Sequence, residues 1–307
     1  MPKKPRSTKP GGEKAPFVAD SIITLPVKEP TTLLPFLIES LPDCKRQTVK
    51  DYLKYNQVMV NGEVTNQFDT PLNPGADVKV NRSREFQVFY HPRMKLFYED
   101  DDIIVVYKGY GLLSMGTDKK KDNTAYSIVR EYLKRKDPRN KLFIVHRLDQ
   151  QTSGLMMFAK NEVAKDAMQH NWNNMVLERK YVAVVEGYLD NPEGEVRSYL
   201  AENAAHEVYS TQDPTLGKLA VTHYRTLAAR HGHTMVELSL ATGRKNQIRV
   251  HMKDLGHPIS GDRRYGGKPN EIHRLALHAQ TLRFVHPVTR RDMNFSSAIP
   301  QAFSKLL

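Results

Sequence analysis

The feature that most constrains the fold is a polar insert of unusual composition between two apolar runs. Phe143–Val145 and Leu155–Ala159 are apolar and predict two strands. The insert between them contains His146, Arg147 and Asp149, although a simple hairpin needs only Asn-Gly. A carboxylate on such a loop indicates either a functional group or an Asp that caps local amides, and the residues alone leave both readings open.

The sequence pattern of the last two thirds of the chain predicts a sheet interrupted by helices. Gly154 ends the polar insert and is expected to adopt a positive φ or to admit a close neighbour. Apolar periodicity predicts helices over 124–136 and over NEVAKDAMQHNWNNM, whereas HTMVELSLATG alternates as a strand does. We therefore expect an α+β fold with a mixed, mostly antiparallel sheet.

A small module is expected before this domain. TTLLPFLIESL and CKRQTVKDYLKYN predict two short helices, and VMVNGEV predicts a hairpin because Asn-Gly favours a type I′ turn. The outer face of the second helix carries four basic residues, Lys45, Arg46, Lys50 and Lys54. We expect a flexible basic tail over residues 1–30, the module over 31–88, and a catalytic-size domain over 89–307.

Charge indicates the class of partner, and the cysteine content and apolar runs indicate the compartment. Lys+Arg 46 against Asp+Glu 34 gives a net charge of +12, which favours polyanions, with a merely basic protein as the alternative. A single cysteine, Cys44, excludes an internal disulfide and fits a reducing compartment. No apolar run approaches the roughly 20 residues of a membrane span, so we expect a cytoplasmic protein with no membrane partner.

A second polar group lies in ATGRKNQIRVHMKDLGHPISGDRRYGG, residues 241–267. The spacing of Ile248, Met252 and Leu255 predicts a helix over 245–254 that ends at Gly256. At the start of this helix, two basic side chains are expected to bind an anion: Arg244 and Lys245. Arg249, one helical turn further along, is expected to be half-buried. It therefore needs a carboxylate partner, for which Asp149 is the candidate.

Several other motifs are excluded. GDRRYGGKP lacks the glycine spacing and the Ser or Thr of a phosphate-binding loop. The scattered histidines lack zinc-site spacing, so no metal site is expected. There is neither a GxSxG elbow nor a GxGxxG after a strand, which argues against acyl transfer and nicotinamide chemistry.

Four ordered segments together resemble the RluA-like family of RNA pseudouridine synthases. HRLDQQTSGL resembles the family signature H-R-L-D-x-x-T-S-G-L, and YEDDDIIVVYKGYGLLS, RKYVAVVEG and the 241–267 segment agree in order and spacing. The resemblance covers nearly everything from 92 to 300. The preceding module resembles a small RNA-binding domain first described in a ribosomal protein.

The resemblance implies an isomerisation of uridine to pseudouridine that requires no cofactor. It assigns the nucleophile to Asp149, an active-site tyrosine to Tyr181 and the salt-bridge partner of the Asp to Arg249. Arg147 is implied to fill the space of the extruded uridine, and His146 is expected to brace the loop. The chain departs from the family pattern at Lys108-Gly109, where Lys-Pro is usual, and at Lys245-Asn246, where Thr-His is usual.

We therefore expect a monomeric enzyme that acts on structured RNA, with large-subunit ribosomal RNA favoured and transfer RNA as the alternative. A different class of function is a non-catalytic RNA-binding or ribosome-assembly factor. A nucleoside glycosidase is disfavoured because nothing suggests a water-positioning pair of carboxylates.

Overall fold

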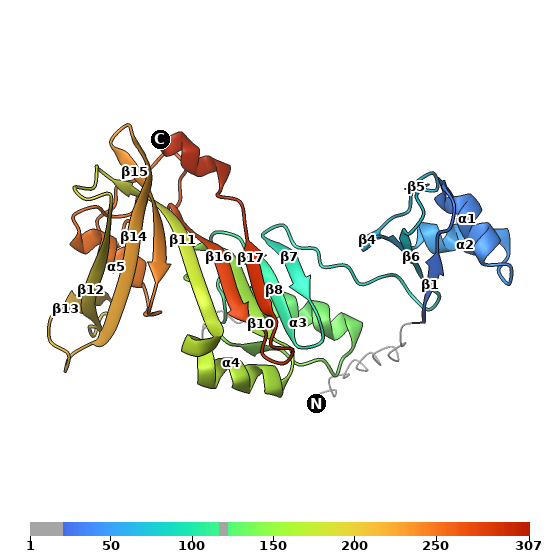
Figure 1. The fold of residues 1–307 in the computed structure, drawn as a ribbon, viewed down its shortest axis with the longest axis horizontal. Coiled ribbons are helices and arrows are strands. Elements are labelled where there is room, and N and C mark those ends of the chain that lie inside the picture. Colours follow the sequence, from blue (N-terminus) through green and yellow to red (C-terminus); the bar gives the residue numbers. More distant parts are fainter. Residues whose placement is uncertain (1–20, 117–121) are drawn as a thin grey trace, which may run out of the picture. The chain divides into compact units, whose positions relative to one another are not determined.

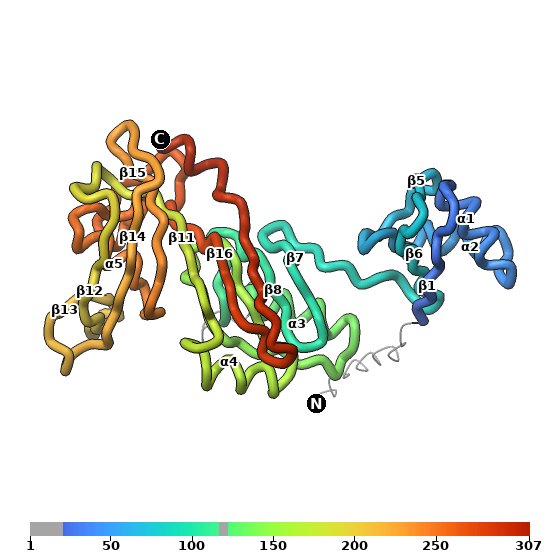
Figure 2. The backbone as a smooth tube through the Cα atoms, in the orientation of Figure 1, coloured from blue at the N-terminus to red at the C-terminus, as the bar shows by residue number. Residues whose placement is uncertain are grey.

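The computed structural model describes residues 21–116 and 122–307. The chain forms two compact units, traced in Figures 1 and 2. One consists of the residues up to Val88 together with Lys134–Arg139, and the other consists of Phe89–Leu133 and Asn140–Leu307. No helix in the described part of the chain is both long enough and apolar enough to cross a membrane.

The first unit packs two helices on a four-stranded sheet. Its elements are β1 (Ile22–Pro26), β2 (Thr31–Thr32), α1 (Leu33–Ser40), α2 (Arg46–Lys54), β3 (Val58–Val60), β4 (Glu63–Val64), β5 (Pro71–Leu72) and β6 (Asp77–Asn81). The strand order is β1-β6-β3-β4, and β2 pairs with β5. Asn61 and Gly62 have φ of 50° and 85°, which confirms the expected type I′ turn between β3 and β4.

The structure differs from the expected tail at residues 22–26. This segment is strand β1, and Ile22 pairs with Asn81 and Pro26 with Asp77 along β6. The predicted end of the tail, residue 30, was therefore wrong. Residues 22–26 form a strand because they pair with another strand more than fifty positions later. The rest of the tail as far as residue 20 lies outside the described residues.

The second unit is built on one large sheet with helices on both faces. Its strands are β7 (Met94–Glu99), β8 (Ile103–Lys108), β9 (Phe143–Ile144), β10 (Ser153–Ala159), β11 (Val176–Glu186), β12 (Glu193–Glu202), β13 (Val208–Thr211), β14 (Lys218–Arg230), β15 (His233–Leu240), β16 (Leu277–Val285) and β17 (Asp292–Ser296). Its helices are α3 (Ala125–Lys136), α4 (Glu162–Met175), α5 (Gln247–Asp254) and the 3₁₀ helix η1 (Gln301–Leu306). Every strand pairing in this sheet is antiparallel except that of β10 with β16, which confirms the expected fold class.

The apolar runs of β8 and β10 are explained by burial on both faces. Val129 and Leu133 of α3 pack on one face with Ile104 and Met156, in one apolar cluster. The neighbouring residues along the same two strands, among them Ile103, pack on the opposite face with α4. Alternate residues of a strand face opposite sides of a sheet, so continuous apolar sequence is required here.

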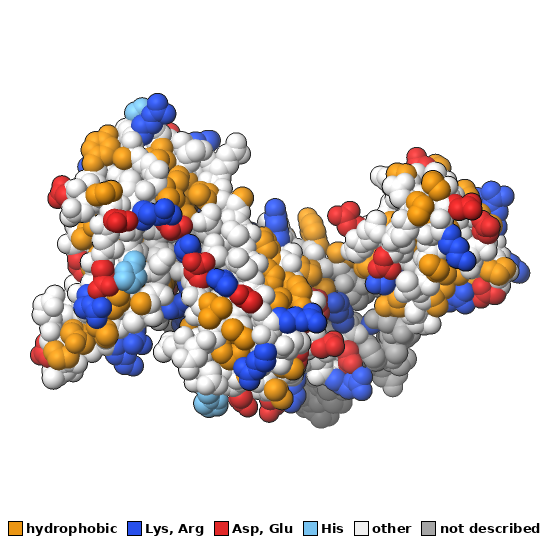
Figure 3. All heavy atoms as spheres, in the orientation of Figure 1, with side chains coloured by type: hydrophobic (Ala, Val, Ile, Leu, Met, Phe, Trp, Pro, Cys, Tyr) orange, Lys and Arg blue, Asp and Glu red, His pale blue; other side chains and the backbone are white. Residues whose placement is uncertain are grey.

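The face of the sheet seen in Figure 3 carries a row of alternating acidic and basic side chains across β14, β15, β11, β16 and β17. This paired-charge face comprises three ion pairs, Arg225–Glu237, Lys180–Glu178 and Arg283–Asp292. Because each cation has a carboxylate neighbour, this face contributes little of the positive charge that would attract a polyanion.

Candidate active site

The polar insert forms the loop between β9 and β10 and places Asp149 where two cavities meet. The strands pair as Phe158 with Ile144 and Ala159 with Phe143, which confirms the two expected strands. Asp149 lines both cavities, of about 560 and 380 Å³. Its backbone carbonyl accepts a hydrogen bond from the Thr152 N–H at 3.1 Å, while its carboxylate makes no hydrogen bond or ion pair within residues 21–116 and 122–307.

Gly154 explains where the loop ends. At this residue β10 begins its parallel pairing with β16, opposite Ala279. Its φ is +125°, and a Cβ there would lie 2.1 Å from the Ala279 carbonyl oxygen. Both expected reasons for a glycine, a positive φ and a close neighbour, are therefore confirmed.

Two buried polar residues, Ser114 and Lys108, form hydrogen bonds to the backbone of the loop. The Ser114 hydroxyl donates to the Leu148 carbonyl at 2.6 Å and accepts from the Leu148 N–H at 3.1 Å. Nζ of Lys108, which is fully buried, donates to the Leu112 carbonyl at 2.8 Å and to the Gln150 carbonyl at 3.4 Å. The residues on both sides of Asp149 are thus bonded to the end of β8 and to the segment that follows it.

His146 braces the loop as expected. Its Nε2 accepts the N–H of Met157 at 3.0 Å, so the start of the loop is bonded to β10. Burial, aided by the charge of Arg179, lowers the pKa of His146 to about 3. The imidazole is therefore neutral at physiological pH and serves as an acceptor.

Tyr181 and Arg249 lie in the same cavity as Asp149, so the three expected catalytic residues are brought together. Burial raises the pKa of Tyr181, and the negative charge of Asp149 adds to this effect. The phenol is therefore protonated at neutral pH and can donate a proton or hydrogen bond. Tyr181 reaches this place from the middle of β11, where it pairs with Leu238 and Ala279.

The carboxylate partner of Arg249 is Asp262, which corrects the expected partner, Asp149. Nε and one terminal nitrogen of Arg249 donate to the two carboxylate oxygens of Asp262, each at 2.7 Å. The other terminal nitrogen donates to Asn246 Oδ1 at 3.0 Å, and the guanidinium lies 4.9 Å from the ring centre of Tyr265. The physical reason is complete burial of Asp262, whose charge requires a cation at hydrogen-bonding distance.

Asp149 still acts on Arg249 through space. The pKa of Arg249 is raised: burial opposes this, but the hydrogen bonds and charge of Asp262 outweigh it, and the charge of Asp149 adds to the rise. Arg249 is thus held rigidly by one carboxylate while it faces the cavity that contains another.

The two departures from the family pattern have structural explanations. Gly109 donates its N–H to the Arg93 carbonyl at 2.7 Å, a hydrogen bond that proline cannot make. Asn246 caps α5 in a left-handed conformation, with φ of 54°, and joins Arg249 to the Tyr265 hydroxyl through its side-chain amide. Gly109 lines neither cavity, whereas Lys245 and Asn246 line both, so the second departure changes the side chains around Asp149.

The expected RNA-binding residues divide between the two units. Arg147, Arg244 and Lys245 line the cavities and are exposed at their rim. Lys245 pairs with Glu202, and Arg244 donates to the Leu219 carbonyl. In the first unit, the basic face of α2 is exposed as expected; it comprises Lys45, directly before the helix, and Arg46, Lys50 and Lys54 within it. Helix α5 begins at Gln247, two residues later than expected.

The sequence reasoning missed five residues of the site, namely Lys108, Ser114, Trp172, Arg179 and Asp262. Arg179 had a detectable signal, because it precedes Tyr181 by two positions on a strand and therefore faces the same side. Asp262 lies in GDRRYGG, a polar segment in which nothing in the sequence indicates a buried carboxylate. The others are visible only once the chain is folded.

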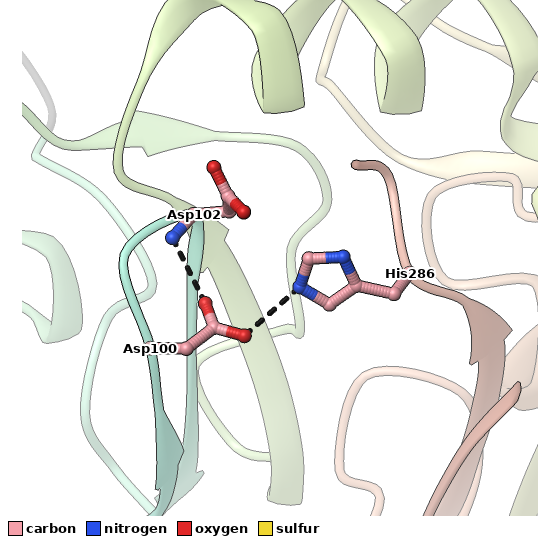
Figure 4. A group of neighbouring side chains, drawn as sticks. All are labelled: Asp100, Asp102 and His286. Carbon is pink, nitrogen blue, oxygen red and sulfur yellow. Dashed lines mark hydrogen bonds and ion pairs between the residues drawn. The ribbon is translucent and has the colours of Figure 1, made fainter. Parts of the chain in front are cut away.

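A further group of titratable side chains, shown in Figure 4, has a structural role. Asp100 follows β7 and accepts the N–H groups of Asp102 and Ile103 on one oxygen. Its other oxygen lies 2.9 Å from Nε2 of His286. Nδ1 of His286 accepts the Val288 and Thr289 N–H groups, so Nε2 carries the proton. The lone pair that a metal ion would need is therefore already used.

Lys108 makes the stability of the fold depend on pH. Burial lowers its pKa from 10.5 to about 7, although the charge of Asp149 opposes this. Between these two values the unfolded chain holds a proton that the folded protein releases, so this lysine makes the fold more stable as the pH rises. We expect the free energy of unfolding of the wild type to rise relative to that of Lys108→Met between pH 7 and 9, as measured in urea. The exposed Lys95→Met is the control, and a pH-independent difference for Lys108→Met would contradict this prediction.

Comparison with known proteins shows which family this chain resembles. The model of the RNA pseudouridylate synthase family matches residues 102–254. Ribosomal large subunit pseudouridine synthase D of Escherichia coli (strain K12) is 32% identical over 288 residues, which are 88% of each chain. A protein of Bacillus subtilis (strain 168) named "Uncharacterized RNA pseudouridine synthase YjbO" is 36% identical over 214 residues, 70% of this chain and 75% of that one.

A solved structure agrees at the level of the fold. Human RNA pseudouridylate synthase domain containing 4 superposes with a TM-score of 0.58 at 23% identity, over 69% of this chain and 91% of that one. The similarity of sequence to the bacterial enzymes, spread over most of the chain, shows that this protein belongs to the RluA-like RNA pseudouridine synthases, which are isomerases.

Proposed function

We propose that this protein converts uridine to pseudouridine in ribosomal RNA of the large subunit, with Asp149 as the nucleophile. The observation that carries the proposal is the carboxylate of Asp149, which has no partner among the residues that the structure describes. It lies at the junction of two cavities, and Tyr181 and Arg249 line the smaller one with it. Synthase D of Escherichia coli, by its name, acts on the large ribosomal subunit, and this chain matches it along 88% of its length. That relative supports the choice of ribosomal over transfer RNA.

The chemistry requires few groups from the protein. The bond between C1′ of the ribose and N1 of uracil breaks, the base turns, and a bond forms between C1′ and C5. C5 loses a proton and N1 gains one, so no electrons are supplied or removed. The carboxylate of Asp149 can add to C1′ or to C6 of the ring, or can assist proton removal from the ribose. The protonated Tyr181 can stack on the base and assist proton transfer.

The target nucleotide must leave its helix to reach Asp149, at a cost of a few kcal/mol. Arg147 is exposed at the rim of both cavities and carries a planar guanidinium that can stack on bases. We propose that it enters the space left by the uridine and offsets part of this cost.

The test is a map of pseudouridine at nucleotide resolution. Unmodified ribosomal and transfer RNA transcripts are incubated separately with the purified protein and with a heat-inactivated sample. New pseudouridine in the large-subunit transcript only is the expected result. Modification of transfer RNA alone would overturn the proposed substrate, and RNA binding without modification would favour the assembly-factor hypothesis.

We propose that the basic face of α2 contributes to affinity rather than to chemistry. Changing Lys45, Arg46, Lys50 and Lys54 together to Gln is expected to weaken RNA binding. Each lost phosphate contact makes the slope of log K against log[salt] shallower by about 0.7 to 0.9. The single-turnover rate at saturating RNA should not change, since these side chains belong to the unit that lacks Asp149.

A matched control removes the same charge from cations that already have carboxylate partners, by changing Lys180, Arg197, Arg225 and Arg283 to Gln. Its salt slope should stay close to that of wild type. A loss of rate equal to the loss of affinity in the α2 variant would show instead that the first unit shapes the active site.

A further inference from the structure

Arg179 carries a half-buried guanidinium that has no carboxylate partner among residues 21–116 and 122–307. It lines the smaller cavity and donates one hydrogen bond, to the Leu240 carbonyl at 3.3 Å. No ion pair involves it in the part of the chain that the structure describes, whereas the neighbouring Arg249 is neutralised by Asp262. Burial lowers the pKa of Arg179, which reflects the cost of keeping this charge away from water. An unpaired buried charge is expensive, so its presence in a cavity suggests that a ligand supplies the anion.

The surroundings of Arg179 fix its direction. Gly243 leaves room for the guanidinium, since a Cβ at that position would lie 2.5 Å from a terminal nitrogen of Arg179. The indole of Trp172 lies on another side, with its ring centre 5.9 Å from the guanidinium carbon. The side chain is thereby held beside Tyr181, which the positive charge of Arg179 also influences.

The ligand that fits is a phosphate group. Uracil and ribose are neutral, so phosphates are the anions that accompany the target nucleotide. A guanidinium has five N–H donors in a planar fork that matches two phosphate oxygens. Among the described residues, one donor of Arg179 is used, in the bond to Leu240. The nearby His146 is neutral and does not compete for the anion.

We propose that Arg179 binds a backbone phosphate adjacent to the uridine that enters the cavity. This inference rests on the proposed function in taking a uridine nucleotide as the ligand. It assigns to Arg179 a positioning role: the phosphate is anchored on one side of Tyr181, and the ribose is thereby held with its C1′ toward Asp149.

The chain offers a reporter for this site, because Trp172 is its single tryptophan. Uridine, uridine 5′-monophosphate and uridine 3′-monophosphate are titrated separately while the emission of Trp172 is recorded. We expect at least one monophosphate to bind about 10- to 100-fold more tightly than uridine, the range for a hydrogen bond to a charged group. Equal affinity of all three for the wild type would overturn the proposal.

Four variants locate the effect. Arg179→Met should abolish the preference for the monophosphate, and Arg179→Lys should retain part of it. Gly243→Ala keeps the arginine but pushes on its guanidinium, and should also reduce the preference even if Arg179→Met fails to fold. Arg283→Met removes the same charge from the paired-charge face and should bind as wild type does. A full preference in Arg179→Met, or an equal loss in Arg283→Met, would contradict the proposal.

This readout is separate from catalysis. A wild type that prefers the monophosphate yet forms no pseudouridine would overturn the proposed function and leave the phosphate site standing. A wild type that forms pseudouridine without the preference would do the reverse. If Arg179→Met slows the single-turnover rate while its nucleotide preference is unchanged, Arg179 acts on the base instead, and the phosphate assignment is wrong.

Discussion

Asp149→Asn is expected to abolish pseudouridine formation while leaving the fold and RNA binding intact. The amide has the shape of the carboxylate but lacks the charge that a nucleophile needs, so the single-turnover rate should fall by roughly 10⁴-fold or more. The carboxylate of Asp149 makes no hydrogen bond to the described residues, and its backbone bond to Thr152 survives the change. The free energy of unfolding should fall by only about 1 kcal/mol, because the charge that helps to stabilise the cations of Lys108 and Arg249 is lost.

The measurement compares the two proteins on the RNA that the map identifies, with binding recorded in parallel. Asp101→Asn, in the exposed turn between β7 and β8, is a control with the same change of charge. Full activity of Asp149→Asn would remove the nucleophile from the proposal. Inactivity of both wild type and variant, with RNA still bound, would instead support a binding factor.

Local patterns predicted most of the elements because local physics determines them. The Asn61-Gly62 turn has both residues at positive φ, a requirement that few other pairs meet. The alternation in β15 follows from one buried face, on which Thr234, Val236 and Leu238 are almost inaccessible. Strand β1 was missed because its partner β6 lies far along the chain, and pairing at that separation leaves little local signal.

Patterns also indicated which residues meet in the site, but not how their charges pair. Asp149, Tyr181 and Arg249 come together as the resemblance implies. The choice between two carboxylates for Arg249 depends on depth of burial, which one sequence does not reveal. Asp262 lies thirteen positions after Arg249 and returns to it only because the chain reverses after α5. The buried Lys108 and Ser114 were likewise indistinguishable from surface residues in the sequence.

Breaking the ion pair of Arg249 and Asp262 is expected to lower both the stability of the fold and the rate of the reaction, and the two effects can be measured separately. The side chains are 8% and 0% exposed, so breaking the pair leaves a buried charge alone. Arg249→Met and Asp262→Asn should each lower the free energy of unfolding by about 3–5 kcal/mol. Asparagine is chosen because its carbonyl can still accept the N–H groups of Arg264 and Tyr265, which bond to Asp262 Oδ1 in the wild type.

The double variant Arg249→Met/Asp262→Asn is the decisive protein. It removes both charges, so its loss of stability in urea should be well below the sum of the two single losses. Its single-turnover rate should nevertheless stay as low as that of Arg249→Met, because the positive charge facing Asp149 is still missing. Recovery of both stability and rate would mean that Arg249 serves only to neutralise Asp262. Recovery of stability alone would establish that the cavity needs this guanidinium for the reaction, with Asp262 as the group that holds it in place.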